Sequence, residues 1–433
     1  MSLDVSKQFT NAGTLPTRTR NALSAGMKGS AILEIAGEVN ALKAAGKTVS
    51  NFTIGDFNAA IFPIPTVLRN AIKDALDDGQ TQYPPAVGVP ELREAIRLST
   101  KRDLGLDYPE GCVQVGAGAR PPIYAAYATL LAPGDTLLYS VPCWNVSYYG
   151  YLNGAVGVPM ATKPENGFLP TLEEIAPHIQ TARMLCLNSP LNPAGTVISK
   201  AQLTEICEAV IVENDRRTAN NERPLILMYD MVYWRLTFGG AVHYTPVGLV
   251  PEMAKYTILV DAASKCFAGT GLRVGWSISP PWIRDQLKPL IGHMGAWAAR
   301  AEQIATADFL LNPPAIETYM EDHGGRLEAS LVQLRDGLWS MRDKGLPVDA
   351  LDAQGAIYLT AHFDLIGKHP KVDSSEDLRA LLLHEAGVAV VPFSAFGYPG
   401  ETGWVRFSVG AVNNTDIADA LTRIEAMLTR LSQ

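Results

Sequence analysis

Hydrophobic residues along the chain form short uninterrupted runs separated by longer helical repeats. The apolar runs have strand length and lie at residues 112–115, 136–141, 183–188, 225–230 and 256–261. Amphipathic stretches with helix-start signals lie between several of them, for example the capping-box pair Ser199 and Gln202. Because the runs are continuous rather than alternating, we predict a largely parallel sheet that helices cover on both faces.

The two ends of the chain follow a mixed pattern. Ser30 is a candidate cap for a helix that ends near Gly46, and Pro90 suits the first turn of another helix. A long helix is predicted at 297–311, followed by strands at 355–364, 388–392 and 404–409 and a helix at 375–387. We therefore predict three parts: an N-terminal segment that joins the small domain (1–50), a large domain (51–300) and a smaller α+β domain (301–433).

Composition narrows the class of protein. The chain has 433 residues, of which 47% are hydrophobic and 18% charged, with a formal net charge of −8. This profile is typical of a globular protein with a large core, and it argues against nucleic acid or an anionic membrane as a partner. Residues 1–13 lack an apolar core of the signal-peptide type, so we expect a cytoplasmic protein.

Cysteine and histidine usage gives no sign of a metal centre. The five cysteines are scattered without a C-x-x-C pair, and the seven histidines show no ligand spacing. We therefore expect neither a disulfide framework nor a bound metal ion.

Candidate catalytic and ligand-binding residues directly follow the predicted strands. In parallel sheets, ligands bind at the carboxyl ends of the strands. The strand that ends near Val115 is followed by a glycine-containing loop and a helix at Arg120, which is an arrangement that binds phosphate. A simple tight turn explains the same residues.

The next strand ends carry amides, a carboxylate and an amine. Asn188 and Asn192 stand beside prolines, Asp230 ends a strand ahead of Tyr233, and Lys265 follows another strand. Taken singly, the asparagines fit an ordinary turn and the aspartate fits a helix cap. Together with the aromatic surface of Trp144, the set matches what pyridoxal phosphate needs, namely a lysine for the Schiff base, an acid for the ring nitrogen and donors for its oxygens.

The sequence resembles the class I and II aminotransferases of pyridoxal-phosphate fold type I, especially the bacterial aspartate and aromatic branch. The likeness covers nearly the whole chain, and its most specific segment is SKCFAGTGLRVGW at 264–276. Further matching segments are YPPAVGVPELREAI, LAPGDTLLYSVPCW, NSPLNPAGTV, YDMVYWRLTF and GWVRFSVG. The resemblance implies a mainly parallel seven-stranded sheet in the large domain, with a smaller α+β domain beside it.

The resemblance also implies roles for individual residues. Lys265 would form the Schiff base with the cofactor and move the proton between the substrate and the cofactor. Asp230 would pair with the ring nitrogen, while Tyr233 and Asn192 would bind the ring oxygen. Trp144 would stack on the ring, and Asn192 and Trp144 would also face the substrate.

A second group of residues would hold the cofactor phosphate. By resemblance, Gly118, Ala119 and Arg120 provide the loop and the helix N-terminus, and Ser264 and Arg273 add side chains. Tyr83 would reach the phosphate of the neighbouring subunit. This implies a homodimer with shared active sites.

By resemblance, two further residues would contact the substrate: Arg406 would bind the substrate α-carboxylate, and Gly55 would lie near the substrate in the N-terminal loop. In 404–409, Val405 and Phe407 alternate toward one face and leave Arg406 on the other. An arginine in a structural ion pair is the alternative interpretation of this strand.

The chain departs from the family pattern at several positions. Arg120 stands in a loop where relatives commonly have a small or polar residue and a glutamine, so it is a phosphate ligand, a substrate-recognition group or a surface residue. Met231 and Phe393 also replace common family residues, and we expect these changes to cluster around the site.

The predicted function is therefore transfer of an amino group between an L-amino acid and a 2-oxo acid, by a ping-pong route through pyridoxamine phosphate. A pyridoxal-phosphate carbon–sulfur β-lyase shares the same cofactor residues and remains the main alternative. A non-catalytic aminotransferase-like sensing module is a remote alternative, because no DNA-binding domain is evident.

Overall fold

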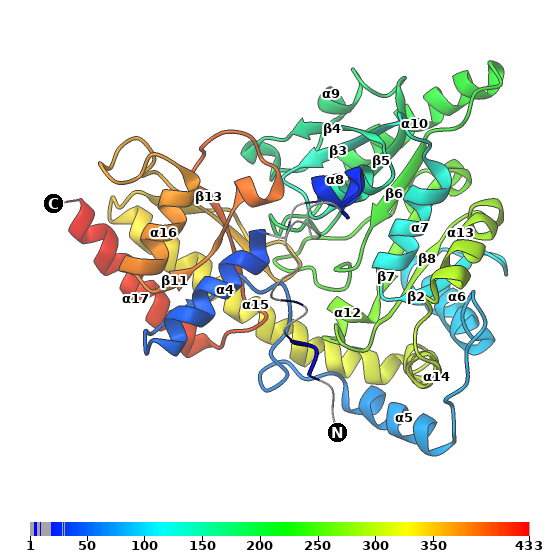
Figure 1. Ribbon diagram of the computed structural model, residues 1–433, viewed down its shortest axis with the longest axis horizontal. Coiled ribbons are helices and arrows are strands. Elements are labelled where there is room, and N and C mark those ends of the chain that lie inside the picture. Colours follow the sequence, from blue (N-terminus) through cyan, green and yellow to red (C-terminus); the bar gives the residue numbers. More distant parts are fainter. Residues whose placement is uncertain (1–3, 7–8, 10–18, 28, 30, 433) are drawn as a thin grey trace.

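The computed structural model describes residues 4–6, 9, 19–27, 29 and 31–432. Its largest element is a seven-stranded sheet with the order β2-β8-β7-β6-β5-β3-β4 (Figure 1). The neighbours from β7 to β4 pair in parallel, whereas β8 is antiparallel to both β2 and β7. The prediction of a mainly parallel seven-stranded sheet is therefore confirmed. The strands are β2 (Val113–Ala117), β3 (Thr136–Val141), β4 (Val156–Ala161), β5 (Ala182–Asn188), β6 (Ile226–Asp230), β7 (Thr257–Ala262) and β8 (Val274–Ile278).

Both faces of this sheet are buried, which explains the continuous apolar runs. Along β5, Met184 and Cys186 point into one hydrophobic cluster with α7 and α13, while Leu185 and Leu187 point into another with α6, α10 and α14. The helices are α5 (Thr66–Asp77), α6 (Pro90–Leu104), α7 (Arg120–Leu130), α8 (Val146–Leu152), α9 (Leu172–Ile175), α10 (Lys200–Ala219), α11 (Pro246–Leu249), α12 (Ala263–Cys266), α13 (Pro281–Met294) and α14 (Arg300–Leu310).

Two strands of this sheet escaped prediction. β4 is an edge strand whose residues are mostly exposed, so it lacks a continuous apolar run. β8 begins directly after Arg273, within the segment that resembles the family's lysine motif. Its antiparallel direction means that Arg273, at its amino end, lies at the same sheet edge as Lys265 at the carboxyl end of β7.

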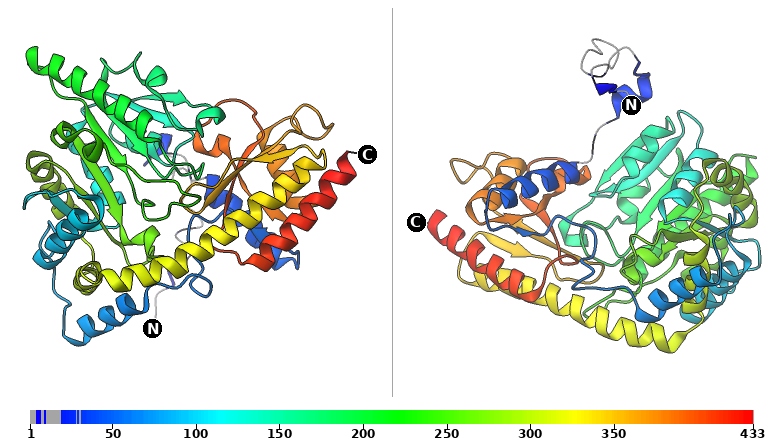
Figure 2. Two further views of the ribbon diagram at one scale, coloured as in Figure 1. Left: turned by 180° about the vertical axis from the view of Figure 1, so that it is seen from behind. Right: turned by 60° about the horizontal axis from the view of Figure 1, so that its bottom comes forward.

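A second domain contains a four-stranded antiparallel sheet with the order β12-β13-β10-β9. A parallel pair, β1 with β11, joins the segment before the large domain to this part of the chain. Figure 2 shows α15 running beneath both domains, with α17 beside its far end. The elements are α3 (Ala22–Gly26), α4 (Ala31–Ala44), β1 (Ser50–Asn51), α15 (Pro313–Asp343), β9 (Val348–Ala350), β10 (Tyr358–Phe363), α16 (Ser375–Glu385), β11 (Val388–Ala389), β12 (Val391–Pro392), β13 (Trp404–Ser408) and α17 (Asn414–Leu431).

The predicted boundaries compare closely with these elements. The strand expected at 388–392 is interrupted after residue 389, and the one expected at 355–364 begins at Tyr358. The Ser199–Gln202 capping box is present, whereas Ser30 lies outside the described residues. Because α14 packs against α5 and α6, we propose that the domain boundary lies within α15 rather than at residue 300.

The described part of the chain was compared with the requirements of a membrane-spanning helix and of a metal site. None of its helices is both long and apolar enough to cross a membrane. No group of three or more histidine, cysteine or acidic side chains is arranged there to hold a metal ion.

Candidate active site

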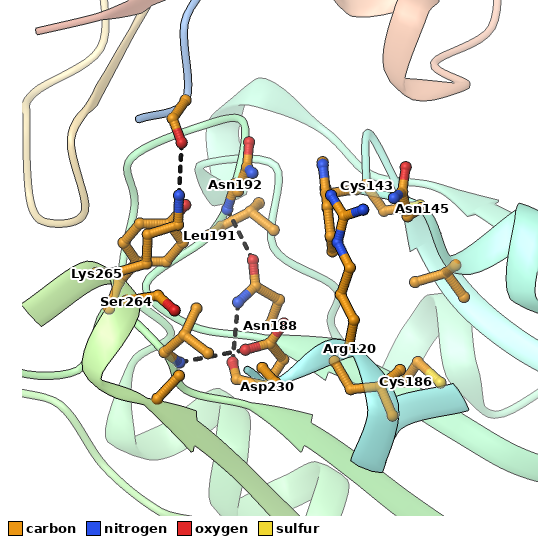
Figure 3. A pocket seen from close by; sticks show the side chains of 18 of the residues that line it. Arg120, Cys143, Asn145, Cys186, Asn188, Leu191, Asn192, Asp230, Ser264 and Lys265 are labelled. Carbon is orange, nitrogen blue, oxygen red and sulfur yellow. Dashed lines mark hydrogen bonds between the residues drawn. The ribbon is translucent and has the colours of Figure 1, made fainter. Parts of the chain in front are cut away.

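A cavity of about 720 Å³ opens at the carboxyl ends of the central strands. Asn188 from β5, Asp230 from β6 and Lys265 from α12 line its base. The small domain contributes Tyr358 and Arg406. Figure 3 shows Asn188, Asp230 and Lys265 around one space.

One end of the cavity is suited to an anion. Gly118, with φ 83°, leads into α7, whose first residue is Arg120. Pro121 and Pro122 have no N–H group, so the first turn offers the N–H groups of Ala119 and Arg120. Neither group donates a hydrogen bond in the described part of the chain. Such free N–H groups at a helix N-terminus attract phosphate.

Arg273 lies across this anion site. Its guanidinium donates to the carbonyl oxygens of Thr270 at 2.7 Å and Ala117 at 3.0 Å, which directs it along the loop that contains Gly118. Ser264 also lines the cavity here. The structure therefore gathers five predicted phosphate ligands, the residues Gly118, Ala119, Arg120, Ser264 and Arg273.

The charges at this end are unbalanced. Partial burial and the nearby Arg120 lower the pKa of Arg273. Among the described residues, neither guanidinium forms an ion pair; Arg120 instead lies over the Trp144 ring, 4.7 Å from its centroid. Two cations that form no ion pair favour an anionic ligand between them.

Lys265 is the lysine of the cavity lining. Its Nζ donates a hydrogen bond to the carbonyl oxygen of Gly55. Burial lowers the pKa of Lys265 to about 8, with Arg406 and Arg120 acting in the same direction and Asp56 and Asp230 opposing them. A much larger fraction of this amine is therefore unprotonated near neutral pH than for an ordinary lysine.

Asp230 is the buried acid of the site. Burial raises its pKa to about 6, although the N–H of Val232 and the charge of Lys265 lower it. One carboxylate oxygen accepts from Val232 N at 3.2 Å, and the backbone oxygen accepts from the Asn188 side chain at 2.9 Å. A positively charged ring nitrogen beside this carboxylate would offset the unfavourable burial of its charge.

Arg406 closes the opposite end from the small domain. Its side chain is 1% exposed and donates to Asn192 Oδ1 at 3.0 Å and to the Thr53 carbonyl at 2.7 Å. Its Nε has no hydrogen-bond partner among the described residues. No ion pair of Arg406 is present among them either, so the structure differs from the alternative of a structural ion pair on this strand. A buried guanidinium with an unused donor is suited to binding a carboxylate.

Tyr233 and Tyr358 meet beside this arginine. Their hydroxyl oxygens are 2.7 Å apart, and the Lys265 Nζ lies 5.8 Å from the Tyr233 ring centroid. Burial, followed by the charge of Tyr358, raises the pKa of Tyr233 well above its ordinary value. Tyr233 is therefore a neutral hydrogen-bond donor and acceptor under physiological conditions.

Tyr83 is 86% exposed and contacts Trp297, away from the cavity of its own chain. Its expected contact with the phosphate of a neighbouring subunit stays a prediction.

The expectation that the departures at Met231 and Phe393 lie around the site differs from the structure. Met231 and Phe393 do not line the cavity: both are buried, and Phe393 packs against Phe168 in an aromatic cluster. These two departures therefore belong to the hydrophobic core of the large domain.

Several lining residues were missed by the sequence analysis, among them Asp56, Thr270 and Tyr358. Asp56 Oδ1 accepts from the Thr270 hydroxyl at 2.5 Å, which connects the loop after β1 to the lysine loop. Tyr358 lies on β10, where it is read from sequence as an ordinary apolar strand residue. Asp56 is the last residue of the motif IGD at 54–56, which is the one local sequence feature that points to it as a site residue. No local sequence feature marks Tyr358 as a site residue.

These residues fit pyridoxal phosphate in size and in charge. The cavity provides free N–H groups and two cations for a phosphate, a lysine of lowered pKa for an aldehyde, and a buried carboxyl for a ring nitrogen. Trp144 and Val232 also line the space where a planar ring would lie. The donor set therefore matches each end of the cofactor.

Comparisons with known proteins agree with this chemistry. The model of the family "Aminotransferase class I and II" matches residues 47–424. An aspartate aminotransferase of Streptomyces avermitilis is 30% identical over 423 residues, covering 97% of this chain and 99% of the relative.

Solved structures show the same likeness in three dimensions. The aspartate aminotransferase of Rhizobium meliloti superimposes with a TM-score of 0.86 at 27% identity, covering 95% of this chain and 99% of that one. An aromatic aminotransferase of Pyrococcus horikoshii gives a TM-score of 0.79 at 28% identity, covering 92% and 99% of the two chains.

Proposed function

Because the chain belongs to the class I and II aminotransferases, a family that uses pyridoxal 5′-phosphate, we propose that its cavity transfers amino groups in two successive half-reactions. An L-amino acid would leave its amino group in the first half, and a 2-oxo acid would collect it in the second. The observation that carries the proposal is the placement of Lys265 between an anion site at Arg273 and a buried carboxylate site at Arg406.

When bound, pyridoxal phosphate supplies an aldehyde that exchanges amines and a ring that accepts electrons. Lys265 holds the aldehyde end, and its freed Nζ moves the proton at the α-carbon of the amino acid. Its pKa, lowered to about 8, makes the unprotonated amine that this step needs more abundant than for an ordinary lysine. Asp230 keeps the ring nitrogen protonated by pairing with it, which preserves the ring's electron affinity.

The remaining residues orient the cofactor and the substrate. Tyr233, Asn192 and Trp144 line the cavity. The first two would bind the ring oxygen, and Trp144 would lie against the ring. Arg406 would bind the substrate α-carboxylate, and its hydrogen bond to Asn192 Oδ1 supports this orientation of the guanidinium. Gly55 leaves room there, because a β-carbon at this residue would lie 2.9 Å from the Tyr358 hydroxyl.

Visible absorbance tests the central assignment. The purified protein reconstituted with pyridoxal phosphate should absorb in the visible range, and Lys265→Ala should abolish the band typical of the lysine-bound cofactor. An amino acid should then bleach the wild-type band and a 2-oxo acid should restore it. Release of pyruvate and ammonia from a cysteine conjugate, without transfer to an added 2-oxo acid, would instead establish a β-lyase.

The substrate range should include acidic amino acids. Arg120 lines the cavity, lies on Trp144 and has no described acidic partner, so a second substrate carboxylate can bind there. The relatives named as aspartate aminotransferases are consistent with this choice.

The variant Arg120→Gln distinguishes the three roles considered for this residue. Substrate recognition predicts that kcat/KM falls for aspartate by ten-fold or more and changes little for a neutral amino acid, since a lost charged hydrogen bond costs roughly 1.5–3 kcal/mol. Weaker binding of pyridoxal phosphate would identify a phosphate ligand. Unchanged values of both would identify a surface residue.

The active unit is a homodimer in this proposal. Tyr83 is exposed and remote from its own cavity, and this is the arrangement expected of a residue that serves a neighbouring subunit. Light scattering should report twice the mass of the 46.7 kDa chain.

A further inference from the structure

We propose that Tyr358 is a positioning residue that couples the carboxylate site at Arg406 to the hydrogen bond that Tyr233 makes with the cofactor ring oxygen. The inference rests on the proposed function, and it assigns to Tyr358 a role that its strand position does not suggest. Three observed contacts carry it: one to Tyr233, one to Arg406 and one to Gly55.

The first contact joins the two phenols across the domain junction. Tyr233 follows β6 of the large domain and Tyr358 begins β10 of the small domain, and their hydroxyl oxygens lie 2.7 Å apart. Both side chains are almost fully buried, at 3% and 1% exposed. Each hydroxyl has a single proton, so only one of the two donates in this hydrogen bond at any moment.

The second contact places a cation against one phenol of the pair. The guanidinium carbon of Arg406 lies 4.5 Å from the centroid of the Tyr358 ring. Burial raises the pKa of both phenols and the charge of Arg406 opposes this rise in both, but Arg406 lies on the face of the Tyr358 ring, and Tyr358 adds to the rise at Tyr233. The Tyr358 hydroxyl is the better donor of the two. Tyr358 therefore donates to Tyr233, which leaves the Tyr233 proton for the cofactor ring oxygen.

The third contact fixes Tyr358 against the backbone. A β-carbon on Gly55 would fall 2.9 Å from its hydroxyl, so the Tyr358 side chain packs directly on the loop after β1. The other charged groups that face it are Asp56 on that loop and Asp230 at the end of β6. Lys265, beyond Tyr233, completes the surroundings.

A substrate carboxylate on Arg406 changes this balance. The carboxylate neutralises the cation beneath the Tyr358 ring, so Tyr358 becomes a weaker hydrogen-bond donor. Tyr233 then donates its proton to Tyr358 instead of to the cofactor. The ring oxygen of the cofactor then receives less of that proton. Carboxylate binding at one end of the cavity thus alters the proton affinity at the other, through one pair of hydroxyl groups.

The experiment is a pH titration of the visible absorbance of the reconstituted holoenzyme, with and without succinate, a dicarboxylate that lacks an amino group. In wild-type protein we expect succinate to raise the pH at the midpoint of this absorbance titration. Tyr358→Phe should raise the midpoint without succinate by roughly half to one pH unit, since one hydrogen bond is lost. The further rise caused by succinate should shrink.

Two further variants separate positioning from general damage. Tyr229→Phe removes another buried hydroxyl, one that donates to the Tyr244 carbonyl at 2.8 Å outside the cavity, and it should leave both midpoints unchanged. In a Tyr233→Phe background, adding Tyr358→Phe should have no additional effect on the midpoint.

The outcomes identify which idea fails. If Tyr358→Phe titrates as wild type with and without succinate, or if its effect persists in the Tyr233→Phe background, the coupling through Tyr233 is wrong while the proposed function stands. If wild-type protein acquires no visible band with pyridoxal phosphate, the proposed function itself is wrong, and so is the inference that rests on it.

Discussion

Gly118 lies against the guanidinium of Arg273 so closely that a β-carbon at residue 118 would fall 2.3 Å from Nη2 of Arg273. Gly118 also has a φ of 83°, a conformation that residues with side chains rarely adopt. The glycine therefore serves two purposes, because it turns the chain into α7 and leaves space for the arginine. Both purposes concern the anion site.

The variant Gly118→Ala should displace Arg273 and weaken cofactor binding. Backbone strain of about 1–2 kcal/mol adds to the lost guanidinium contact, so we expect the Kd for pyridoxal phosphate to rise by roughly ten-fold or more. Fluorescence titration of the cofactor-free protein measures it. Gly271→Ala is the matched control, since no atom lies within 4 Å of a β-carbon there, and an equal loss in both variants would contradict the argument.

Asp230 should make the cofactor-free protein less stable at alkaline pH. Its folded-state pKa of about 6 exceeds the ordinary 3.8, so the folded protein binds this proton more tightly than the unfolded chain does. That favourable contribution is present at low pH and is lost as the pH rises through about 6. Asp230→Asn should therefore stabilise the cofactor-free protein at pH 8 by about 1–3 kcal/mol.

Urea denaturation at several pH values checks this prediction. The gain from Asp230→Asn should shrink toward pH 4, while cofactor binding weakens at every pH. Asp308→Asn, at an exposed position of α14, is the control. A gain of equal size at pH 4 and pH 8 would show that ionisation of Asp230 is not its cause.

Lys265 should react with amine reagents at unusually low pH. In the cofactor-free protein, the rate of its labelling by a neutral acylating reagent should rise with a midpoint near pH 8, since burial lowers its pKa to about 8. Peptide mapping by mass spectrometry separates Lys265 from exposed lysines such as Lys200.

Asp56→Asn should move that midpoint to still lower pH. The Asp56 carboxylate favours the protonated amine of Lys265, so its removal takes away an interaction that raises the pKa. An upward movement of the midpoint would show that loss of the Asp56–Thr270 hydrogen bond, rather than loss of charge, dominates.

Tyr83 of one subunit should complete the active site of the other subunit. Protein with Tyr83→Ala and protein with Lys265→Ala should each have low activity. Co-expressed as mixed dimers, they should form one complete site per dimer, in which the Lys265→Ala chain supplies Tyr83. Activity of purified mixed dimers that stays at the level of the single variants would show that Tyr83 does not act across the interface.

Local sequence patterns determined the chemistry at the strand ends. Asn188, Asp230 and Lys265 each follow an apolar run, and the parallel direction of β5, β6 and β7 brings such positions to one edge whatever the details of packing. The Ser199 capping box and the Pro90 helix start were equally visible, because capping depends on residues within one helical turn.

Only the tertiary structure decided which distant residues meet. Arg406 and Asn192 are 214 positions apart and Tyr233 and Tyr358 are 125 apart, and no periodicity encodes contacts across two domains. The edge strand β4 and the antiparallel β8 depend likewise on their neighbours. Hydrophobic burial fixes the direction of each element locally, whereas contacts between elements follow from how two separate cores pack against each other.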